Sequence, residues 1–247
     1  MNPKVIVCDL DGTLTESKSN LTSEMAEVLC QVLRKYRLAI ISGASYKQFQ
    51  KQFLTYLCCG GEILQNLFLF PANGTACYRF DNLENVWQVY DEKMTNEEKK
   101  KIFQAFEKAT TESGVIITNH YGELVEDRGG QVTFSGCGQN APLDIKEKWD
   151  PDQKKRRKIV EMLEQLIPQF EIKIGGATSI DVTHKGIDKA YAIGKIENFL
   201  KVRKEDIIFI GDALFSGGND SSAYTTGVKC ISVSGPDDTE RILQNLL

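Results

Sequence analysis

Asp9 and Asp11 stand two residues apart in DLDGTLT (residues 9–15), directly after an apolar run. Carboxylates this close repel each other unless a cation lies between them or one of them is protonated. Such oxygen ligands favour a hard cation such as Mg²⁺. Gly12 permits a sharp turn and Thr13 offers a hydroxyl group. The stretch therefore predicts a magnesium site, although a strand-to-turn junction that merely favours Asp and Gly would also produce it.

Further polar side chains follow at the ends of other predicted elements. Ser42 and Gly43 end the second predicted strand, where a small hydroxyl group could hold a phosphate oxygen. Asp212 ends a later strand with GGND (217–220) just beyond it, and Lys189 begins a helix. Open α/β sheets bind ligands beyond the carboxyl ends of their strands. Each residue alone fits a turn or a solvated helix end, but together and in this order they indicate a phosphate site with a metal.

Alternating strands and helices position these residues. Short apolar, β-branched runs predict buried strands at 4–10, 38–42, 67–74, 207–213 and 230–235, of which 67–74 ends in a Pro and Asn-Gly turn. Helices with one apolar face are expected at 22–35 after the cap Thr22, from Ser45, at 188–200 and from Asp238. Strands that alternate with helices predict a parallel sheet with helical crossovers.

The middle of the chain has a different pattern. The predicted order is a helix at 95–109, strands at 114–120, 123–127 and 131–136, a helix from Asp150-Pro151, and strands at 170–176 and 178–183. This α+β order predicts a domain inserted into the first one. We expect a Rossmann-like core at 1–81 and 186–247 and an α+β cap at 82–185.

Composition excludes several classes of protein. The 247 residues are 41% hydrophobic with a formal net charge of −4, which excludes a mostly disordered chain and disfavours a nucleic-acid coat. The basic run KKRRK (154–158) is expected to be a solvated helix face. No apolar run reaches the roughly 18 residues of a membrane helix and no signal peptide is indicated, so we expect a cytoplasmic protein. Cys58 and Cys59 are adjacent and no C-x-x-C pair occurs, which is typical of reduced thiols.

The motifs D-x-D-G-T-L-T, S-G, K and G-D…G-G-N-D together resemble those of the haloacid dehalogenase superfamily of phosphotransferases, over the whole chain. Within that superfamily the chain resembles eukaryotic-type phosphomannomutases and their bacterial hydrolase relatives. The matching stretches are GGATSIDV (175–182), GIDKAYAI (186–193), GDALFSGGND (211–220) and GPDDT (235–239). The resemblance implies a core with the larger class of cap.

The resemblance also implies a role for each matched residue. Asp9 would attack phosphorus and become an aspartyl phosphate. Asp11 would protonate the leaving oxygen and then activate the next acceptor. Mg²⁺ would be held by the Asp9 carboxylate, the main-chain oxygen of Asp11 and Asp212. Ser42 and Lys189 would hold the transferred phosphoryl group.

Other matched residues are expected to select the substrate. By the same resemblance, the residues that would contact a sugar phosphate are Thr13, Lys18, Gly43, Arg128, Ser179 and Asp181. Gln139 and Lys146 stand where the mutases carry two further arginines. Gln139 brings no charge, and Lys146 lacks the forked guanidinium group of Arg. Asp220 would lie in the outer shell of the metal.

The expected function is Mg²⁺-dependent hydrolysis of a sugar phosphate, or of a similar small phosphometabolite, through an aspartyl phosphate. The alternative is a phosphomannomutase that interconverts mannose 1-phosphate and mannose 6-phosphate, because the motifs do not decide whether water or sugar receives the phosphoryl group. A catalytically silent binding module is a third possibility, which the intact acidic residues disfavour. We expect a small phosphorylated substrate as partner, no nucleic acid, no membrane, and a monomer or homodimer.

Overall fold

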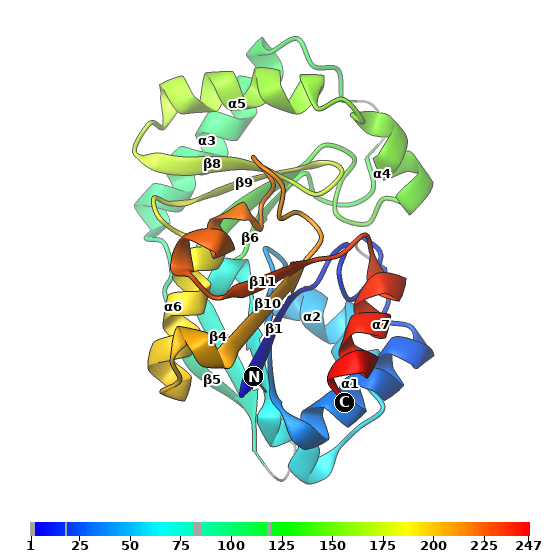
Figure 1. Cartoon of the computed structure of the whole chain (residues 1–247). Helices are drawn as coiled ribbons and strands as arrows, with labels where there is room; N and C mark the ends of the chain where they lie inside the picture. Colours follow the sequence, from blue (N-terminus) through cyan, green and yellow to red (C-terminus); the bar gives the residue numbers. More distant parts are fainter. Residues whose placement is uncertain (1–2, 18, 82–84, 118–119) are drawn as a thin grey trace. The chain divides into compact units, whose positions relative to one another are not determined.

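A seven-stranded sheet runs through the first of two units of the chain, in the order β11-β10-β1-β2-β3-β4-β5 (Figure 1). The computed structural model describes residues 3–17, 19–81, 85–117 and 120–247. The first unit, the core unit, consists of Met1–Asp91 and Asp188–Leu247, and the second, the cap unit, is Glu92–Ile187. The core unit is thus discontinuous in sequence, and the cap unit is an insertion into it.

Five neighbouring strands, from the edge strand β11 to β3, are parallel to one another. They are β1 (Val5–Asp9), β2 (Arg37–Ile41), β3 (Leu67–Phe70), β10 (Ile207–Gly211) and β11 (Lys229–Ser232). Every residue of β1, β3 and β10 is buried, as expected for parallel strands that are covered on both faces. Burial on both faces explains why the sequence shows these strands as short continuous apolar runs.

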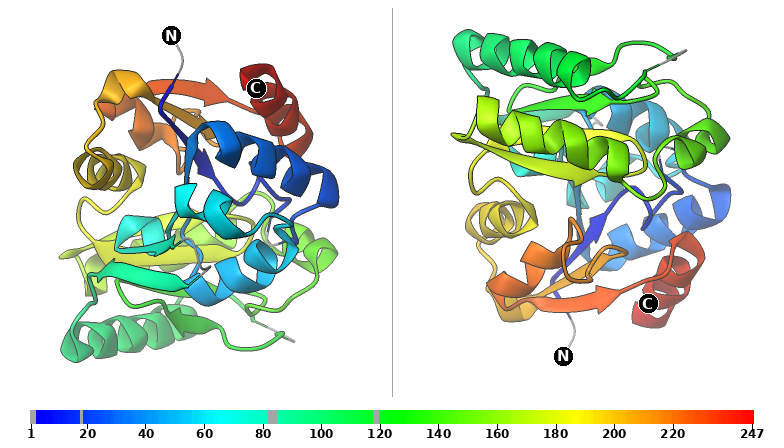
Figure 2. Two further views of the ribbon diagram at one scale, coloured as in Figure 1. Left: turned by 90° about the horizontal axis from the view of Figure 1, so that it is seen from below. Right: turned by 90° about the horizontal axis from the view of Figure 1, so that it is seen from above.

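Helices cover both faces of this sheet (Figure 2). Successive residues of β1 point to opposite faces, so that Ile6 packs in one cluster with residues of α1, α2 and α7, and Val7 in another with residues of α6. The helices are α1 (Ser23–Lys35), α2 (Tyr46–Gln52), α6 (Lys189–Leu200) and α7 (Pro236–Leu246). A parallel sheet between two layers of helices confirms the predicted Rossmann-like α/β core.

The core sheet extends beyond the predicted strands. β4 (Ala76–Phe80) and β5 (Val86–Asp91) add an antiparallel hairpin to β3. For this reason the core unit extends to Asp91, whereas we expected the inserted domain to begin at residue 82. Four of the six residues of β5 are exposed, and its sequence VWQVYD does not alternate between apolar and polar residues. The signal that could have found this strand is its content of β-branched and aromatic residues.

The predicted Pro and Asn-Gly turn at the end of 67–74 directly follows β3. β3 ends at Phe70, because Pro71 has no backbone N–H that could continue the ladder. Ala72 and Asn73 then adopt φ values of +47° and +54°, in the left-handed region that extended strands do not use.

The cap unit contains an antiparallel sheet in the order β6-β7-β9-β8. Its strands are β6 (Val125–Asp127), β7 (Gln131–Ser135), β8 (Phe170–Gly175) and β9 (Ser179–His184). Its helices are α3 (Asn96–Glu112), α4 (Leu143–Trp149) and α5 (Lys154–Leu166). Phe106 of α3 and Ile159 of α5 pack with Phe134 of β7 in one apolar cluster, so both helices cover the same face of the sheet. This arrangement confirms the predicted α+β class of the inserted unit.

Two features of the cap unit differ from the sequence-based expectation. The predicted strand 114–120 does not form in its described residues, 114–117 and 120, and Ile116 is 77% exposed. The short helix α4 was not predicted, because its seven residues carry no clear apolar period.

Asp150 and Arg156 form a buried ion pair at the start of α5. The Asp150 carboxylate accepts hydrogen bonds from the backbone N–H groups of Lys155 (2.9 Å) and Arg156 (3.1 Å). The prediction that Asp150 is the N-cap and Pro151 the first residue of the helix is wrong, because α5 begins at Lys154 and its N-cap is Gln153. The Asp150 carboxylate nevertheless satisfies two N–H groups of the first turn from outside the helix. The Arg156 Nε donates to Asp150 Oδ2 at 2.9 Å.

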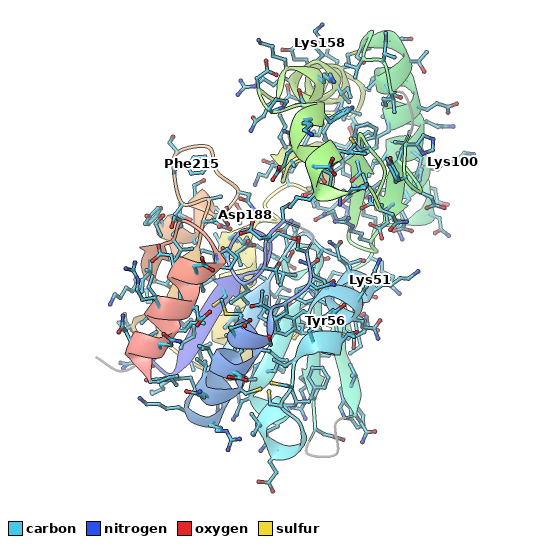
Figure 3. All side chains as sticks on the ribbon, turned by 90° about the vertical axis from the view of Figure 1, so that its right-hand side faces the viewer. Lys51, Tyr56, Lys100, Lys158, Asp188 and Phe215 are labelled. Carbon is cyan, nitrogen blue, oxygen red and sulfur yellow. The ribbon has the colours of Figure 1, made fainter. Side chains whose placement is uncertain are left out.

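Arg156 also corrects the prediction of a wholly solvated basic run at 154–158. Its side chain is 2% exposed, and its Nη1 donates to the carbonyl oxygens of Gly175 (3.1 Å) and Gly176 (2.7 Å). Arg156 thereby ties α5 to the turn between β8 and β9, a contact that residue type alone does not show. Lys158, labelled in Figure 3, is exposed as predicted.

Replacement of Arg156 should destabilise the chain more than replacement of a neighbouring lysine. Arg156→Met leaves the Asp150 carboxylate buried without its cation, so we expect a loss of about 3–5 kcal/mol in the free energy of unfolding. Lys154→Met is the matched control, because Lys154 pairs with Asp152 in an exposed position and should change little. Urea unfolding of both variants measures the difference, and equal losses would contradict the structural role of Arg156.

Candidate active site

Three carboxylates meet beyond the carboxyl ends of β1 and β10. Asp9 is the last residue of β1, Asp212 follows β10, and Asp220 lies in the loop beyond it. One oxygen of each carboxylate lies within 4.8 Å of an oxygen of each of the other two. This edge is where open α/β sheets bind their ligands. The structure thus brings together Asp9 and Asp212, two predicted metal ligands, and places Asp220 beside them.

Lys189 places a buried ammonium group among these carboxylates. It is the first residue of α6, whose N-terminus is capped by the side chain of Asp188 (Figure 3). The Lys189 Nζ donates to Asp9 Oδ1 and, at 2.8 Å, to the carbonyl oxygen of Ile41. It also lies 3.4 Å from Asp220 Oδ1. The side chains of Lys189 and Asp9 are only 1% and 4% exposed, so water screens this pair little.

The cluster holds more negative charge than Lys189 alone can neutralise. Burial raises the pKa of Asp9 well above its usual value; Lys189 opposes this rise, and Asp220 adds to it. Burial and the charge of Asp220 also raise the pKa of Asp212. Asp220 Oδ1 has no hydrogen-bond partner among the described residues. Three acidic side chains, one lysine and an oxygen that lacks a hydrogen bond fit a divalent, oxygen-preferring cation such as Mg²⁺.

The loop after β1 packs directly against Asp212. Gly12 has a φ of +91°, and a Cβ atom at this position would lie 2.6 Å from Asp212 Oδ2. Thr13 Oγ1 donates to Asp212 Oδ1, and the Asp212 N–H donates back to Thr13 Oγ1, both at 3.0 Å. Thr13 therefore fixes a candidate metal ligand, while its contact with the substrate stays a prediction. The predicted contact of Lys18 lies outside the described residues.

Ser42 and Gly43 lie beside the same cluster. Ser42 directly follows Ile41, whose carbonyl oxygen accepts the lysine hydrogen bond. Ser42 is 2% exposed, and its Oγ accepts from the Ala44 N–H at 3.0 Å. The Asn73 N–H donates to the Ser42 carbonyl oxygen at 2.9 Å, so the turn after β3 braces this position. The predicted contact of Ser42 and Gly43 with a phosphate is compatible with this placement and stays a prediction.

Asp11 contacts a side chain that sequence reasoning missed. Its Oδ1 accepts a hydrogen bond of 3.0 Å from Nε2 of Gln52, the last residue of α2. Gln52 is only 3% exposed. In the sequence Gln52 is one of several glutamines on a short helix, and no spacing marks it. Only the packing of α2 against the loop after β1 identifies it.

The cap unit brings Arg128 and Gln139 together. Arg128 Nη2 donates to Gln139 Oε1 at 3.2 Å, and Arg128 Nε donates to Glu126 Oε2 at 2.7 Å. Gln139 Nε2 is buried without a hydrogen-bond partner in the described part of the chain. Lys146 of α4 stands at the second position where the mutases carry an arginine, and it is 5% exposed. Gln139 therefore offers an unsatisfied N–H donor next to the predicted phosphate-binding arginine.

Ser179 and Asp181 point from β9 to the same face of the cap sheet, since they are two residues apart. The register pairs Asp181 with Thr133 of β7, whose Oγ1 donates to Asp181 Oδ1 at 2.7 Å. It pairs Ser179 with Ser135, and their hydroxyl oxygens lie 3.4 Å apart. These residues form a polar face opposite the face that packs on α3 and α5. Their contact with a sugar stays a prediction.

The sequence profile of a family described as eukaryotic phosphomannomutase matches residues 25–247. The chain belongs to this family. A phosphomannomutase of Encephalitozoon cuniculi is 30% identical over 250 residues, covering 98% of this chain and 93% of the relative. That of Saccharomyces cerevisiae is 28% identical over 252 residues, covering 98% and 93%.

Solved structures support the same fold. A haloacid dehalogenase-like hydrolase of Bacteroides thetaiotaomicron has a TM-score of 0.66 at 17% identity, and covers 99% of this chain and 100% of that one. A C-terminally truncated IMP-nucleotidase of Plasmodium falciparum has a TM-score of 0.74 at 16% identity, over 99% of this chain and 71% of that one. These similarities, together with the family membership, confirm the resemblance to the haloacid dehalogenase superfamily.

Addition of Mg²⁺ should raise the melting temperature of the chain, because a ligand that binds only the folded state stabilises it. We expect the rise to be lost in Asp212→Asn, which removes a carboxylate from the cluster. Asp206→Asn is the control, because Asp206 is not part of the cluster. Its carboxylate lies 3.2 Å from Lys4 Nζ, and the variant should keep the rise in melting temperature. Thermal unfolding at several Mg²⁺ concentrations tests this. An equal rise in wild type and Asp212→Asn would exclude the cluster as the metal site.

Proposed function

We propose that the chain is a Mg²⁺-dependent phosphotransferase that isomerises a hexose phosphate through an aspartyl phosphate on Asp9, as a phosphomannomutase. The observation that carries the proposal is the buried pair of Asp9 and Lys189 among further carboxylates at the strand ends. We expected hydrolysis as the main activity. Relatives of 28% and 30% identity are named phosphomannomutases, which favours isomerisation, the alternative.

Asp9 is the proposed nucleophile. A carboxylate oxygen of Asp9 gives an electron pair to phosphorus, and the electrons of the broken P–O bond go to the sugar oxygen. A protein catalyses phosphoryl transfer mainly by positioning the reacting groups and by neutralising their charge. Lys189, which donates to Asp9, reduces the repulsion between this carboxylate and the anionic substrate. Ser42, at the end of β2, is proposed to hold an oxygen of the transferred group.

Bound Mg²⁺ would supply further positive charge at the phosphoryl group. Its proposed ligands are the Asp9 and Asp212 carboxylates and the main-chain oxygen of Asp11, with Asp220 beside them. Thr13 holds Asp212 by two hydrogen bonds, so the ligand is positioned before the ion binds.

Asp11 is the proposed acid and base. It gives a proton to the sugar oxygen when the P–O bond breaks, and it takes a proton from the next acceptor when the aspartyl phosphate is attacked. If the acceptor is another hydroxyl group of the sugar, the product is the isomer. If the acceptor is water, the product is free phosphate.

Hydrolysis is the second candidate, and Gln139 is the observation that favours it. An arginine can give a phosphate group two parallel charge-assisted hydrogen bonds, whereas Gln139 can give it one bond from a neutral donor. With Gln139 in place of an arginine, the sugar phosphate would be held less firmly, and water would reach the aspartyl phosphate more often.

The proposed partner is a small phosphorylated sugar that contacts Arg128, Ser179 and Asp181 of the cap unit. No helix among the described residues has both the length and the apolar character needed to cross a membrane. The expected cytoplasmic location, the monomeric or homodimeric state and the lack of nucleic-acid binding stay predictions.

Asp9→Asn should lower turnover at least about 10³-fold, because an amide is no nucleophile. Lys189 keeps its bond to the Ile41 carbonyl oxygen in this variant, so we expect it to fold. ³¹P NMR on mannose 1-phosphate with Mg²⁺ and a trace of hexose 1,6-bisphosphate measures turnover and product together. Mannose 6-phosphate as the main product indicates the mutase, and free phosphate the hydrolase. Retained turnover in Asp9→Asn would falsify the covalent mechanism.

Gln139→Arg should lower the KM for mannose 1-phosphate by about tenfold, since the guanidinium fork can add a second hydrogen bond to the charged phosphate, worth about 1.5–3 kcal/mol. It also places a second cation beside Arg128, so the variant without substrate should melt at a lower temperature than wild type. Gln139→Met controls for size and should not lower the KM. Steady-state kinetics and thermal unfolding check both effects, and an unchanged KM in Gln139→Arg means that this side chain does not face the substrate.

A further inference from the structure

Gln52 joins three segments of the core unit through its side chain. Its Nε2 donates to Asp11 Oδ1 at 3.0 Å and to Thr15 Oγ1 at 2.8 Å. Its Oε1 accepts from Gln48 Nε2, one helical turn earlier, at 3.1 Å. Its carbonyl oxygen accepts from the Leu21 N–H at 2.9 Å. Gln52 thus links α2 to both ends of the segment between β1 and α1; Lys51 and Tyr56 mark this region in Figure 3.

This network fixes the orientation of the amide. The Thr15 hydroxyl group gives its own proton towards the Leu10 carbonyl oxygen (3.4 Å), so it accepts from Gln52. A flipped amide would turn its oxygen towards the Asp11 carboxylate and lose the bond from Gln48. Because Gln52 is 3% exposed, water cannot replace these bonds at low cost.

The contact with Asp11 constrains a reactive carboxylate. Asp11 lies in the turn after β1, where its backbone forms an isolated bridge to Thr15 and belongs to no strand. An N–H donor on Oδ1 limits rotation of the carboxylate about its Cβ–Cγ bond. Proton transfer is efficient only when the acid lies within hydrogen-bond reach and at a suitable angle to the leaving oxygen.

We infer that Gln52 is a positioning residue for phosphoryl transfer: its amide N–H holds the Asp11 carboxylate in the orientation that delivers a proton to the leaving oxygen. The inference rests on the proposed function, in which Asp11 is the acid. It assigns to α2, through its last residue, a part in the chemistry and not only in the packing of the sheet.

The leaving group of the substrate separates this role from a structural one. The alkoxide oxygen of mannose 6-phosphate needs a proton as the P–O bond breaks, whereas the nitrophenolate of p-nitrophenyl phosphate leaves largely without one. Loss of orientation at Asp11 should therefore slow the sugar phosphate selectively. A general disturbance of the core unit should slow both esters alike.

The test compares kcat/KM for these two esters, with Mg²⁺, in wild type, Gln52→Ala, Gln52→Glu and Gln50→Ala. Gln52→Glu has the shape of Gln and can still accept from Gln48, but it turns an acceptor towards Asp11 in place of the donor. We expect both Gln52 variants to lose about 10- to 100-fold on mannose 6-phosphate, and less than about 3-fold on p-nitrophenyl phosphate. Gln50 is exposed on the same helix, so Gln50→Ala is expected to match wild type on both.

Three results would overturn the inference. If Gln52→Glu matched wild type on mannose 6-phosphate, shape and not the N–H donor would be what matters. If both Gln52 variants lost equally on both esters, the residue would be structural. If wild type consumed neither ester, the proposed function itself would fail, and with it the role of Gln52; this result differs from the first two, in which wild type is active.

Discussion

One ammonium group buried among three carboxylates is the constraint on which the core unit depends. A charge removed from water costs several kcal/mol, so Lys189 and Asp9 are tolerated in the interior because each partners the other. The two residues are 180 positions apart in sequence. Their contact requires α6 to begin where β1 ends, which the buried strands and the Asp188 cap bring about. In the sequence, the inserted unit separates the segment that carries Asp9 from the segment that carries Lys189. Neither segment of the core unit can therefore form the site alone.

The two units use their sheets differently, and this sets where substitutions are tolerated. The core sheet is packed on both faces, and Gly12 and Thr13 fit directly against a candidate metal ligand. Change there disturbs both packing and chemistry. The cap sheet packs on α3 and α5 with one face and carries polar side chains on the other. Gln139 is not part of the apolar cluster and can therefore differ from the mutase pattern without loss of that packing.

The sequence predicted those features that depend on the residue pattern of a single strand or helix. Continuous apolar runs revealed the parallel strands, and the geometry of open sheets then placed Asp9, Asp212 and Lys189 together. The sequence analysis missed the roles of residues that depend on contacts between elements far apart in the chain. Arg156 is one of five basic residues in a row, and only the carboxylate of Asp150 and two turn carbonyls make it the buried one. Gln52 is likewise an ordinary helix residue until α2 packs on the loop after β1. The β4–β5 hairpin was missed although VWQVY (86–90) is rich in the β-branched and aromatic residues typical of strands, because its residues do not alternate between apolar and polar.

In the proposed mechanism, the choice between isomerisation and hydrolysis depends on the cap unit more than on the core. Both reactions share every step up to the aspartyl phosphate, and they diverge when a second acceptor reaches phosphorus. A sugar that stays bound excludes water, and binding energy far from the reacting atoms keeps it there. At Gln139 a neutral N–H donor stands next to Arg128, and an arginine there could give a phosphate one more charge-assisted hydrogen bond, worth about 1.5–3 kcal/mol. Each 1.4 kcal/mol changes a partition ratio about tenfold. If Gln139 contacts the sugar phosphate as proposed, this one side chain would shift the product from isomer towards free phosphate while the catalytic cluster stays the same.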